Sequence, residues 1–299
     1  MPRLTVRHVT VYRYRKPVGF GEHRLMFRPR DSHDLRLIRT ALTIQPAAEV
    51  RWLHDVFSNS IAIARFEGQA EVLRFESEIE IEHYGLDDPN FPVEPYARGY
   101  PFSYSSDEIP DLGRTIERHY PDPGRKVDTW ARRFVENGET ETTMLLGQMT
   151  RAINEQFAYQ TRFTVGTQTP LETLESGSGT CRDLALLMME AVRSLGLAAR
   201  FVSGYLYDPA LDPQIALQGA AQPVLMGAGS THAWVQVYLP GAGWVEYDPT
   251  NGLVGGANLI RVAVARDPEQ AVPLQGSYIG AAEDFIGMEV DVKVSAKQS

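Results

Sequence analysis

The sequence predicts an α+β protein, in which a β-rich N-terminal domain precedes a core of helices followed by antiparallel strands. Two observations carry this prediction. Apolar and polar residues alternate with period two from Leu4 to about Tyr84, whereas helical periodicity begins only near Val127. After Gly196 the pattern becomes strand-like again. Strands and helices that occupy separate stretches of a chain are typical of the α+β class.

The first 85 residues read as an antiparallel, sandwich-like β-domain. Alternation is clearest over residues 4–12 and 76–82, and polar turn clusters such as 30–34 and 58–60 separate the runs. A strand with this alternation places one face in a core and the other in water. We therefore assign residues 1–85 to this domain.

Residues 86–110 form a proline-rich strap between the two domains. Five prolines fall at positions 89, 92, 95, 101 and 110, among glycines and aromatic residues. The aromatic side chains give the strap apolar surface, so we expect it to dock on the domains rather than act as a flexible tether. The docking candidates are Tyr96, Tyr100, Phe102 and Tyr104.

The remaining residues, 111–299, are predicted to form the core. Apolar residues recur at three- and four-residue steps over 127–135 and 142–153, which predicts two helices. A third helix is predicted from Cys181 to Leu195, with Gly196 as its C-terminal stop. Strands are then expected at 199–206, 232–239 and 243–248, and a long surface loop between Asp208 and Ser230.

Composition narrows the possible functions. The 299 residues carry a net charge of −9, which gives no electrostatic reason to bind nucleic acid or anionic lipid. There is one cysteine, so neither an intramolecular disulfide nor a cysteine-rich zinc site can form. No signal-peptide pattern or apolar run of membrane-spanning length is present, so we expect a cytoplasmic protein.

The single cysteine has the surroundings of a reactive thiol. Cys181 follows a glycine-rich turn and starts the predicted helix, where free backbone N–H groups and the helix dipole stabilise a thiolate. Thr180 is expected to cap this helix together with Asp183. A free cysteine on its own is more often an inert buried residue, so the interpretation needs partners elsewhere in the chain.

Two such partners follow in the sequence. His232 opens a predicted strand and is the expected general base, and Asp248 ends the next strand and is expected to orient the imidazole. A tight turn at 240–243 would join the two strands as a hairpin and bring these side chains together. Asp248 precedes a proline, so a simple turn-initiating role is the alternative.

Four blocks of sequence resemble the core of the transglutaminase-like superfamily: Gly-Thr-Cys-Arg-Asp at 179–183, Ala-Arg-Phe-Val-Ser-Gly-Tyr at 199–205, Thr-His-Ala-Trp at 231–234 and Gly-Trp-Val-Glu-Tyr-Asp-Pro-Thr-Asn at 243–251. The first 85 residues resemble the β-rich N-terminal domain of its bacterial members. The resemblance implies a papain-like fold and a Cys181–His232–Asp248 triad that forms a thioester with an amide or peptide carbonyl. The acyl group would then pass to an amine or to water.

The resemblance also implies an oxyanion-hole side chain ahead of the cysteine, for which Gln156, Tyr159 and Gln160 remain equal candidates. We expect no cofactor and no metal, because no acidic loop of the EF-hand type is present. The expected partner is a protein or peptide substrate, and the oligomeric state is not predicted. A catalytically degenerate binding module on the same fold is the alternative function.

Several nearby residues are interpreted as structural. Trp234 and Trp244 fall on strands as large packing residues, although Trp234 lies two positions from His232 and could share its face. Arg200 and Asp183 are expected either to pair in the interior or to remain solvated. The histidines of the N-terminal domain lack the spacing of a metal site.

Overall fold

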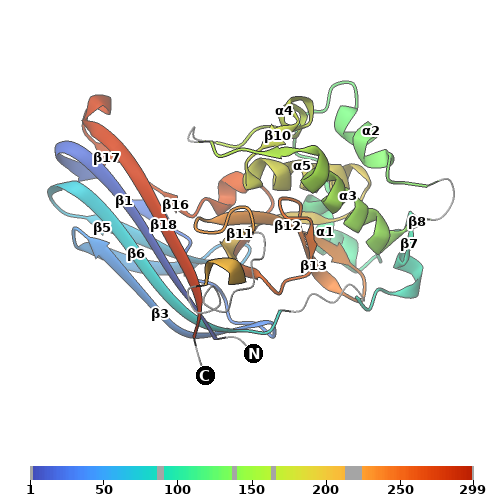
Figure 1. Cartoon of the computed structure of the whole chain (residues 1–299), viewed down its shortest axis with the longest axis horizontal. Coiled ribbons are helices and arrows are strands. Elements are labelled where there is room, and N and C mark those ends of the chain that lie inside the picture. The colour runs from blue at the N-terminus through green and yellow to red at the C-terminus, as the bar shows by residue number, and fades with distance from the viewer. Residues whose placement is uncertain (1–2, 86–90, 137–139, 163–165, 213–223, 298–299) are drawn as a thin grey trace.

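The computed structural model describes residues 3–85, 91–136, 140–162, 166–212 and 224–297. A strongly curved N-terminal sheet stands at one side of the molecule, and a helix-covered antiparallel sheet forms the other side (Figure 1). The predicted α+β fold is therefore confirmed.

The N-terminal domain contains two antiparallel sheets. Strand β1 is the centre of the larger one, since it pairs with β6 along one edge and with β17 and β18 along the other. The larger sheet comprises β1 (Arg3–Phe20), β3 (Leu35–Gln45), β6 (Gln69–His83), β17 (Tyr278–Ile279) and β18 (Phe285–Lys297). The smaller one comprises β2 (His23–Leu25), β4 (Ala48–His54), β5 (Ser60–Phe66) and β16 (Leu274–Gln275).

The two sheets share an apolar core, as a sandwich requires. Alternate residues of β6 point inward, and Leu73 and Phe75 are completely buried against Ala62 and Ala64 of β5. Further along β6, Ile79 and Ile81 belong to a second cluster that also contains residues of β11 and β15. The long strands β1 and β6 thus pack on the smaller sheet at one end and on the core sheet at the other.

The predicted boundary of the core domain needs a correction. We assigned all residues after 110 to the core, but β18 pairs with β1 over nearly its whole length, from Arg3↔Lys297 to Tyr14↔Phe285. Strands β16 and β17 also join the N-terminal sheets. The chain therefore returns to its first domain, because an unpaired edge of β1 would leave a row of backbone hydrogen-bonding groups without partners.

The part of the strap that lies within the described residues is ordered and docked. It contains the short helix η1 (Pro95–Ala97), strand β7 (Gly99–Tyr100) and the start of helix α1 (Glu108–Ile116). Tyr100 and Tyr104 are buried, and their hydroxyl groups donate to the carbonyl oxygens of Leu195 and Tyr238. Residues 86–90 of the strap lie outside the described residues.

Helices cover one face of the core sheet. They are α2 (Lys126–Arg132), α3 (Thr142–Gln156), α4 (Pro170–Ser176) and α5 (Cys181–Ser194). The sheet has the order β14–β13–β12–β11–β15, formed by β11 (Ala199–Leu206), β12 (His232–Leu239), β13 (Gly243–Asp248), β14 (Leu253–Val254) and β15 (Leu259–Ala265). The short strands β8 (Thr140–Glu141), β9 (Ala158–Tyr159) and β10 (Ser178–Gly179) lie outside this sheet.

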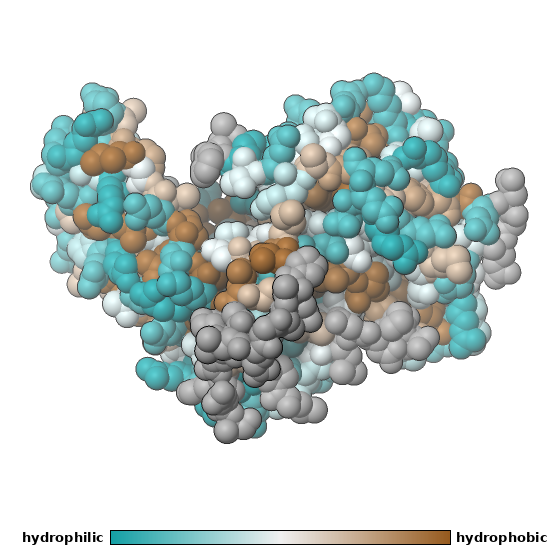
Figure 2. All heavy atoms as spheres, viewed as in Figure 1, coloured by the Kyte–Doolittle hydropathy of each residue, from teal (hydrophilic) through white to brown (hydrophobic). Residues whose placement is uncertain are grey.

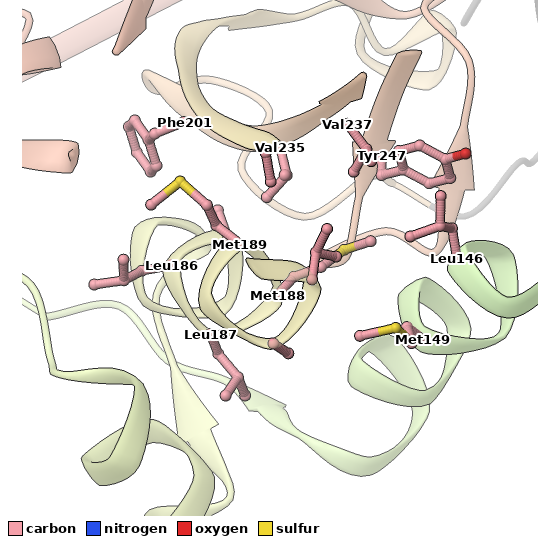
Figure 3. Packing of buried hydrophobic residues seen from close by; sticks show 14 of the residues in the cluster. Leu146, Met149, Leu186, Leu187, Met188, Met189, Phe201, Val235, Val237 and Tyr247 are labelled. Atoms are coloured by element: carbon pink, nitrogen blue, oxygen red, sulfur yellow. The ribbon is translucent and has the colours of Figure 1, made fainter. Parts of the chain in front are cut away.

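Helix α5 is the centre of the main core. Met188 and Met189 of α5 pack with Val235 and Val237 of β12 and with Met149 of α3 (Figure 3). Nearly every side chain of α5 is buried, because the sheet covers one side of the helix and α2, α3 and α4 cover others. This packing fixes the position of the first residue of α5, which is Cys181.

The outer surface is uneven. Figure 2 shows an open notch between the outer end of the N-terminal sheet and the helical part of the molecule. Two apolar side chains on β18, those of Ile286 and Met288, are more than half exposed.

None of the helices in the described ranges has both the length and the apolarity needed to cross a membrane.

Candidate active site

The local sequence places Cys181 at the first position of α5. Thr180 has an extended backbone, with φ −77° and ψ 171°, and forms a capping box with Asp183. The Asp183 carboxylate accepts hydrogen bonds from the Thr180 N–H at 2.8 Å and from the Thr180 hydroxyl at 2.9 Å. The helix therefore begins where the sequence predicted, and the Cys181 side chain, 7% exposed, lies at its positive end.

Asp183 also holds the segment in front of the cysteine. Its other oxygen accepts from the Gln168 N–H at 2.7 Å and from Arg162 at 3.0 Å. Gly179 lies so close that a Cβ atom there would be 2.7 Å from the Asp183 Cβ. Gly179, two residues before the cysteine, is thus needed for the turn to pack on the first turn of α5.

His232 and Asp248 meet at one end of the β12–β13 hairpin. The strands pair from Val235↔Tyr247 to Leu239↔Gly243, and the two side chains lie just beyond the paired residues. His232 Nε2 is 2.8 Å from Asp248 Oδ2, and both side chains are fully buried. The remaining Asp248 oxygen accepts from the Thr250 N–H at 2.9 Å, so the carboxylate is fixed from both sides.

The surroundings of His232 favour its charged form. Burial alone would lower the pKa of His232, but the charge and hydrogen bond of Asp248, followed by the side chain of Cys181, raise it to about 10. Nδ1 is the ring atom that Asp248 leaves free, and it is buried. The side chain of Cys181 lies close enough to the imidazole to contribute to this rise in the pKa.

A short described segment, residues 224–231, covers this imidazole. A Cβ on Gly227 would lie 2.5 Å from His232 Nδ1, so the backbone touches the ring. Asn251 ties the segment to the site. Its side chain accepts from the Met226 N–H at 2.8 Å and donates to Asp248 Oδ2 at 2.8 Å. The rest of the predicted surface loop, residues 213–223, lies outside the described residues.

One residue at the site, Asn251, was missed by the sequence analysis. It stands at the end of the 243–251 block, and that block was the available signal. For Trp234 the sequence analysis favoured a packing role and left open that it shares the face of His232. Trp234 stacks on His232 with ring centroids 6.0 Å apart and an interplanar angle of 27°. Its indole N–H donates to Glu246, which is buried beside it. The period-two spacing of His232 and Trp234 was the signal for this shared face.

The three oxyanion-hole candidates differ in their positions. Gln156 and Gln160 are exposed, whereas Tyr159 is half-buried and pairs in parallel with Gly179, two residues before the cysteine. Burial raises the pKa of Tyr159, and the charge of Cys181 raises it further. Of the three candidates, Tyr159 is therefore the one whose pKa depends on the charge of Cys181.

The pairing considered for Asp183 and Arg200 does not form. Asp183 binds Arg162, as described above, because both lie at the start of α5. Arg200 lies on the opposite face of the sheet, where it donates to Gln236 at 2.7 Å and stacks 4.0 Å above the ring of Trp244. No group of His, Cys, Asp and Glu side chains suited to a metal ion occurs in the described parts of the chain.

A cysteine at the start of a buried helix, with a histidine–aspartate pair on the neighbouring antiparallel sheet, defines the class of papain-like α+β folds. The comparisons agree with this class. Residues 4–82 match the bacterial transglutaminase-like N-terminal region, and residues 128–249 match the transglutaminase-like superfamily. The chain therefore contains a core of the transglutaminase-like superfamily at residues 128–249, preceded by the N-terminal region of its bacterial members at residues 4–82.

Relatives and solved structures extend this result. The chain is 35% identical over 122 residues to Uncharacterized protein ML0607 of Mycobacterium leprae, which covers 41% of this chain and 40% of that protein. It is 27% identical over 307 residues to Uncharacterized protein Rv2569c of Mycobacterium tuberculosis, covering 97% and 92%. A Cytophaga hutchinsonii protein named a putative cysteine protease has a TM-score of 0.71 at 16% identity, covering 100% of this chain and 91% of that one, and shows a shared fold.

Proposed function

We propose that this protein is a thiol-dependent enzyme that acts on amide or peptide bonds through a thioester on Cys181. The observation that carries the proposal is the buried His232–Asp248 pair, 2.8 Å apart, whose imidazole interacts with Cys181 at the start of α5. Such a pair can hold an imidazolium beside a thiolate, which is the nucleophile in this chemistry.

The residues act in two stages. In the first, the Cys181 thiolate forms a bond to the substrate carbonyl carbon, and His232 gives its proton to the departing nitrogen as the carbon–nitrogen bond breaks. In the second, His232 takes a proton from water or from an amine, which attacks the thioester and releases Cys181 as thiolate. Asp248 keeps Nε2 of His232 protonated and the ring oriented throughout.

The oxyanion formed in both stages needs hydrogen-bond donors. The free N–H groups at the start of α5 are suited to this role, because they carry the positive end of the helix dipole. Tyr159 is our choice for the side-chain donor, since it is the only one of the three candidates that is half-buried next to the cysteine turn. Water as the final acceptor, giving a peptidase or deamidase, is favoured over amine transfer, because cross-linking of abundant proteins would harm the cell.

Alkylation tests the nucleophile before any substrate is known. At pH 6 a simple thiol is almost entirely protonated, so we expect iodoacetamide to modify Cys181 at least about tenfold faster than it modifies glutathione. His232→Ala should remove this advantage. Equal and slow alkylation in both proteins would overturn the proposal and favour the binding-module alternative.

The acyl acceptor is tested with a glutamine-containing peptide. Release of ammonia or cleavage of the peptide in water indicates hydrolysis, whereas a hydroxamate formed with added hydroxylamine indicates transfer. Cys181→Ala is the matched control, since it removes only the sulfur and should abolish each product.

A further inference from the structure

A cavity of about 560 Å³ lies between the two domains, away from Cys181. Its walls come from both, with Arg30, Asp34 and Phe57 on the N-terminal side and Arg200, Trp244 and Glu246 on the core sheet. Its volume is in the range of cavities that enclose small ligands. None of the candidate catalytic side chains lines it.

The cavity lies on the sheet face that carries the histidine–aspartate pair. Residues two apart on a strand share a face, so Glu246 lies on the face of Asp248 on β13. Gln236 lies likewise on the face of His232 and Trp234 on β12. At about 3.3 Å per residue, Glu246 lies roughly 7 Å along the strand from Asp248. The indole of Trp234 stands between, stacked on His232 and bonded to Glu246.

Two of the three carboxylates on the lining, Asp34 and Glu246, share one arginine. Arg261 donates to Glu246 at 2.8 Å and to Asp34 at 3.2 Å, and so bridges the core sheet and the N-terminal domain. Asp31, the third carboxylate, accepts from the Leu37 N–H at 2.7 Å at the exposed rim. Burial raises the pKa of Glu246, and the charge of Arg261 opposes this rise.

Two guanidinium groups on the lining, those of Arg200 and Arg30, form no ion pair with a described carboxylate. Within the described residues, no carboxylate lies at ion-pair distance from Arg200, which is held by Gln236 and by the ring of Trp244. Arg30 donates to the Phe57 carbonyl at 3.3 Å and forms no ion pair with a carboxylate in the described ranges. Burial lowers the pKa of Arg200 to about 9, Glu246 opposes this, and the positive charges of Arg261 and Arg30 add to the lowering.

We propose that this cavity binds a carboxylate group, held by the guanidinium groups of Arg200 and Arg30 beside the ring of Trp244. A planar guanidinium matches a carboxylate with two parallel hydrogen bonds, and the flat indole favours a planar anion over a tetrahedral one. The carboxylate belongs either to a free small acid or to an acidic residue of the substrate. Binding of a free acid does not depend on the proposed enzymatic activity, whereas a carboxylate carried by the substrate rests on it.

Binding is tested on the full chain with succinate as the probe, followed by tryptophan fluorescence and by calorimetry. We expect saturable binding that Arg30→Met and Arg200→Met each weaken at least about tenfold, since each removes charged hydrogen bonds. Arg114→Met, a change at an exposed arginine that does not line the cavity, is the matched control and should have no effect. Arg30 is exposed, so its variant decides the result if Arg200→Met fails to fold.

The outcomes separate clearly. No saturable binding of succinate or of a glutamate-containing peptide, or binding that ignores Arg30→Met, overturns the proposal. Tighter binding of inorganic phosphate than of succinate, with the same arginine dependence, overturns the choice of carboxylate. Where the peptide binds, protection of Cys181 from iodoacetamide indicates a carboxylate carried by the substrate. Binding without protection indicates a free acid.

Discussion

Replacing Asp248 by Asn should reverse the charge state of His232 at neutral pH. The pKa of His232 is raised from 6.5 to about 10, which corresponds to about 5 kcal/mol in favour of the imidazolium at 1.36 kcal/mol per pH unit. Burial opposes this rise, and Asp248 is its largest positive cause. With Asn at position 248 burial dominates, so we expect the pKa of His232 to fall below 6.5.

Imidazole NMR signals followed from pH 5 to 10.5 measure this directly. In the wild type the His232 signal should remain that of the cation to well above pH 8, and in Asp248→Asn it should be that of the neutral ring at pH 7. His33, an exposed residue of the N-terminal domain, is the internal control. A wild-type His232 that titrates near 6.5, or an unchanged titration in the variant, would refute the reasoning.

The same difference has a thermodynamic consequence. A folded-state pKa above the unfolded one means that the folded protein holds an extra proton between the two values. The stability from the pair is therefore complete below pH 6.5 and is lost as the pH rises toward the folded value, by about 1.4 kcal/mol per pH unit. Urea unfolding of Cys181→Ala, in which no thiol titrates, should show this slope, and adding Asp248→Asn should remove it.

Three further predictions concern the same core. Asp183→Asn should lower the free energy of unfolding by roughly 3 kcal/mol, because it breaks a buried ion pair with Arg162; urea unfolding showing a loss below about 1 kcal/mol would contradict this. Leu187→Ala, at a fully buried position in α5, should cost about 2–5 kcal/mol through the cavity left behind, measured in the same way. Tyr159→Phe should lower kcat about 10²-fold with little change in KM if the hydroxyl stabilises the oxyanion; an unchanged kcat would exclude that role.

The period-two alternation and the helical periodicity of apolar residues predicted the strands and helices that bury one face. The strands around Leu4–Tyr12 and Glu76–Glu82 and the helix from Cys181 were predicted because one face of each is buried. The predicted hairpin at 240–243 also forms and places His232 near Asp248. The catalytic roles of His232 and Asp248 stay predictions.

Other elements depend on contacts that the sequence does not display. Helix α4 is short and has little periodicity, although Thr169 and Glu172 form a capping box that was a readable signal. Helix α1 contains Pro110 in its first turn, where the missing N–H costs nothing, and we had taken that proline as part of the strap. The partner of β1 could not be predicted at all, since pairing with β18 joins residues nearly 300 positions apart.

The pairing of β18 with β1 bears on the order in which the protein folds. During synthesis, β1 and β6 are made before the core, but the strand that covers the other edge of β1 follows the core in the sequence and is made after it. Until then the edge of β1 is available to other extended chains, which makes the nascent N-terminal domain a site for chaperone binding or for aggregation. Completion of this domain therefore waits for the core that lies between its two parts in the sequence.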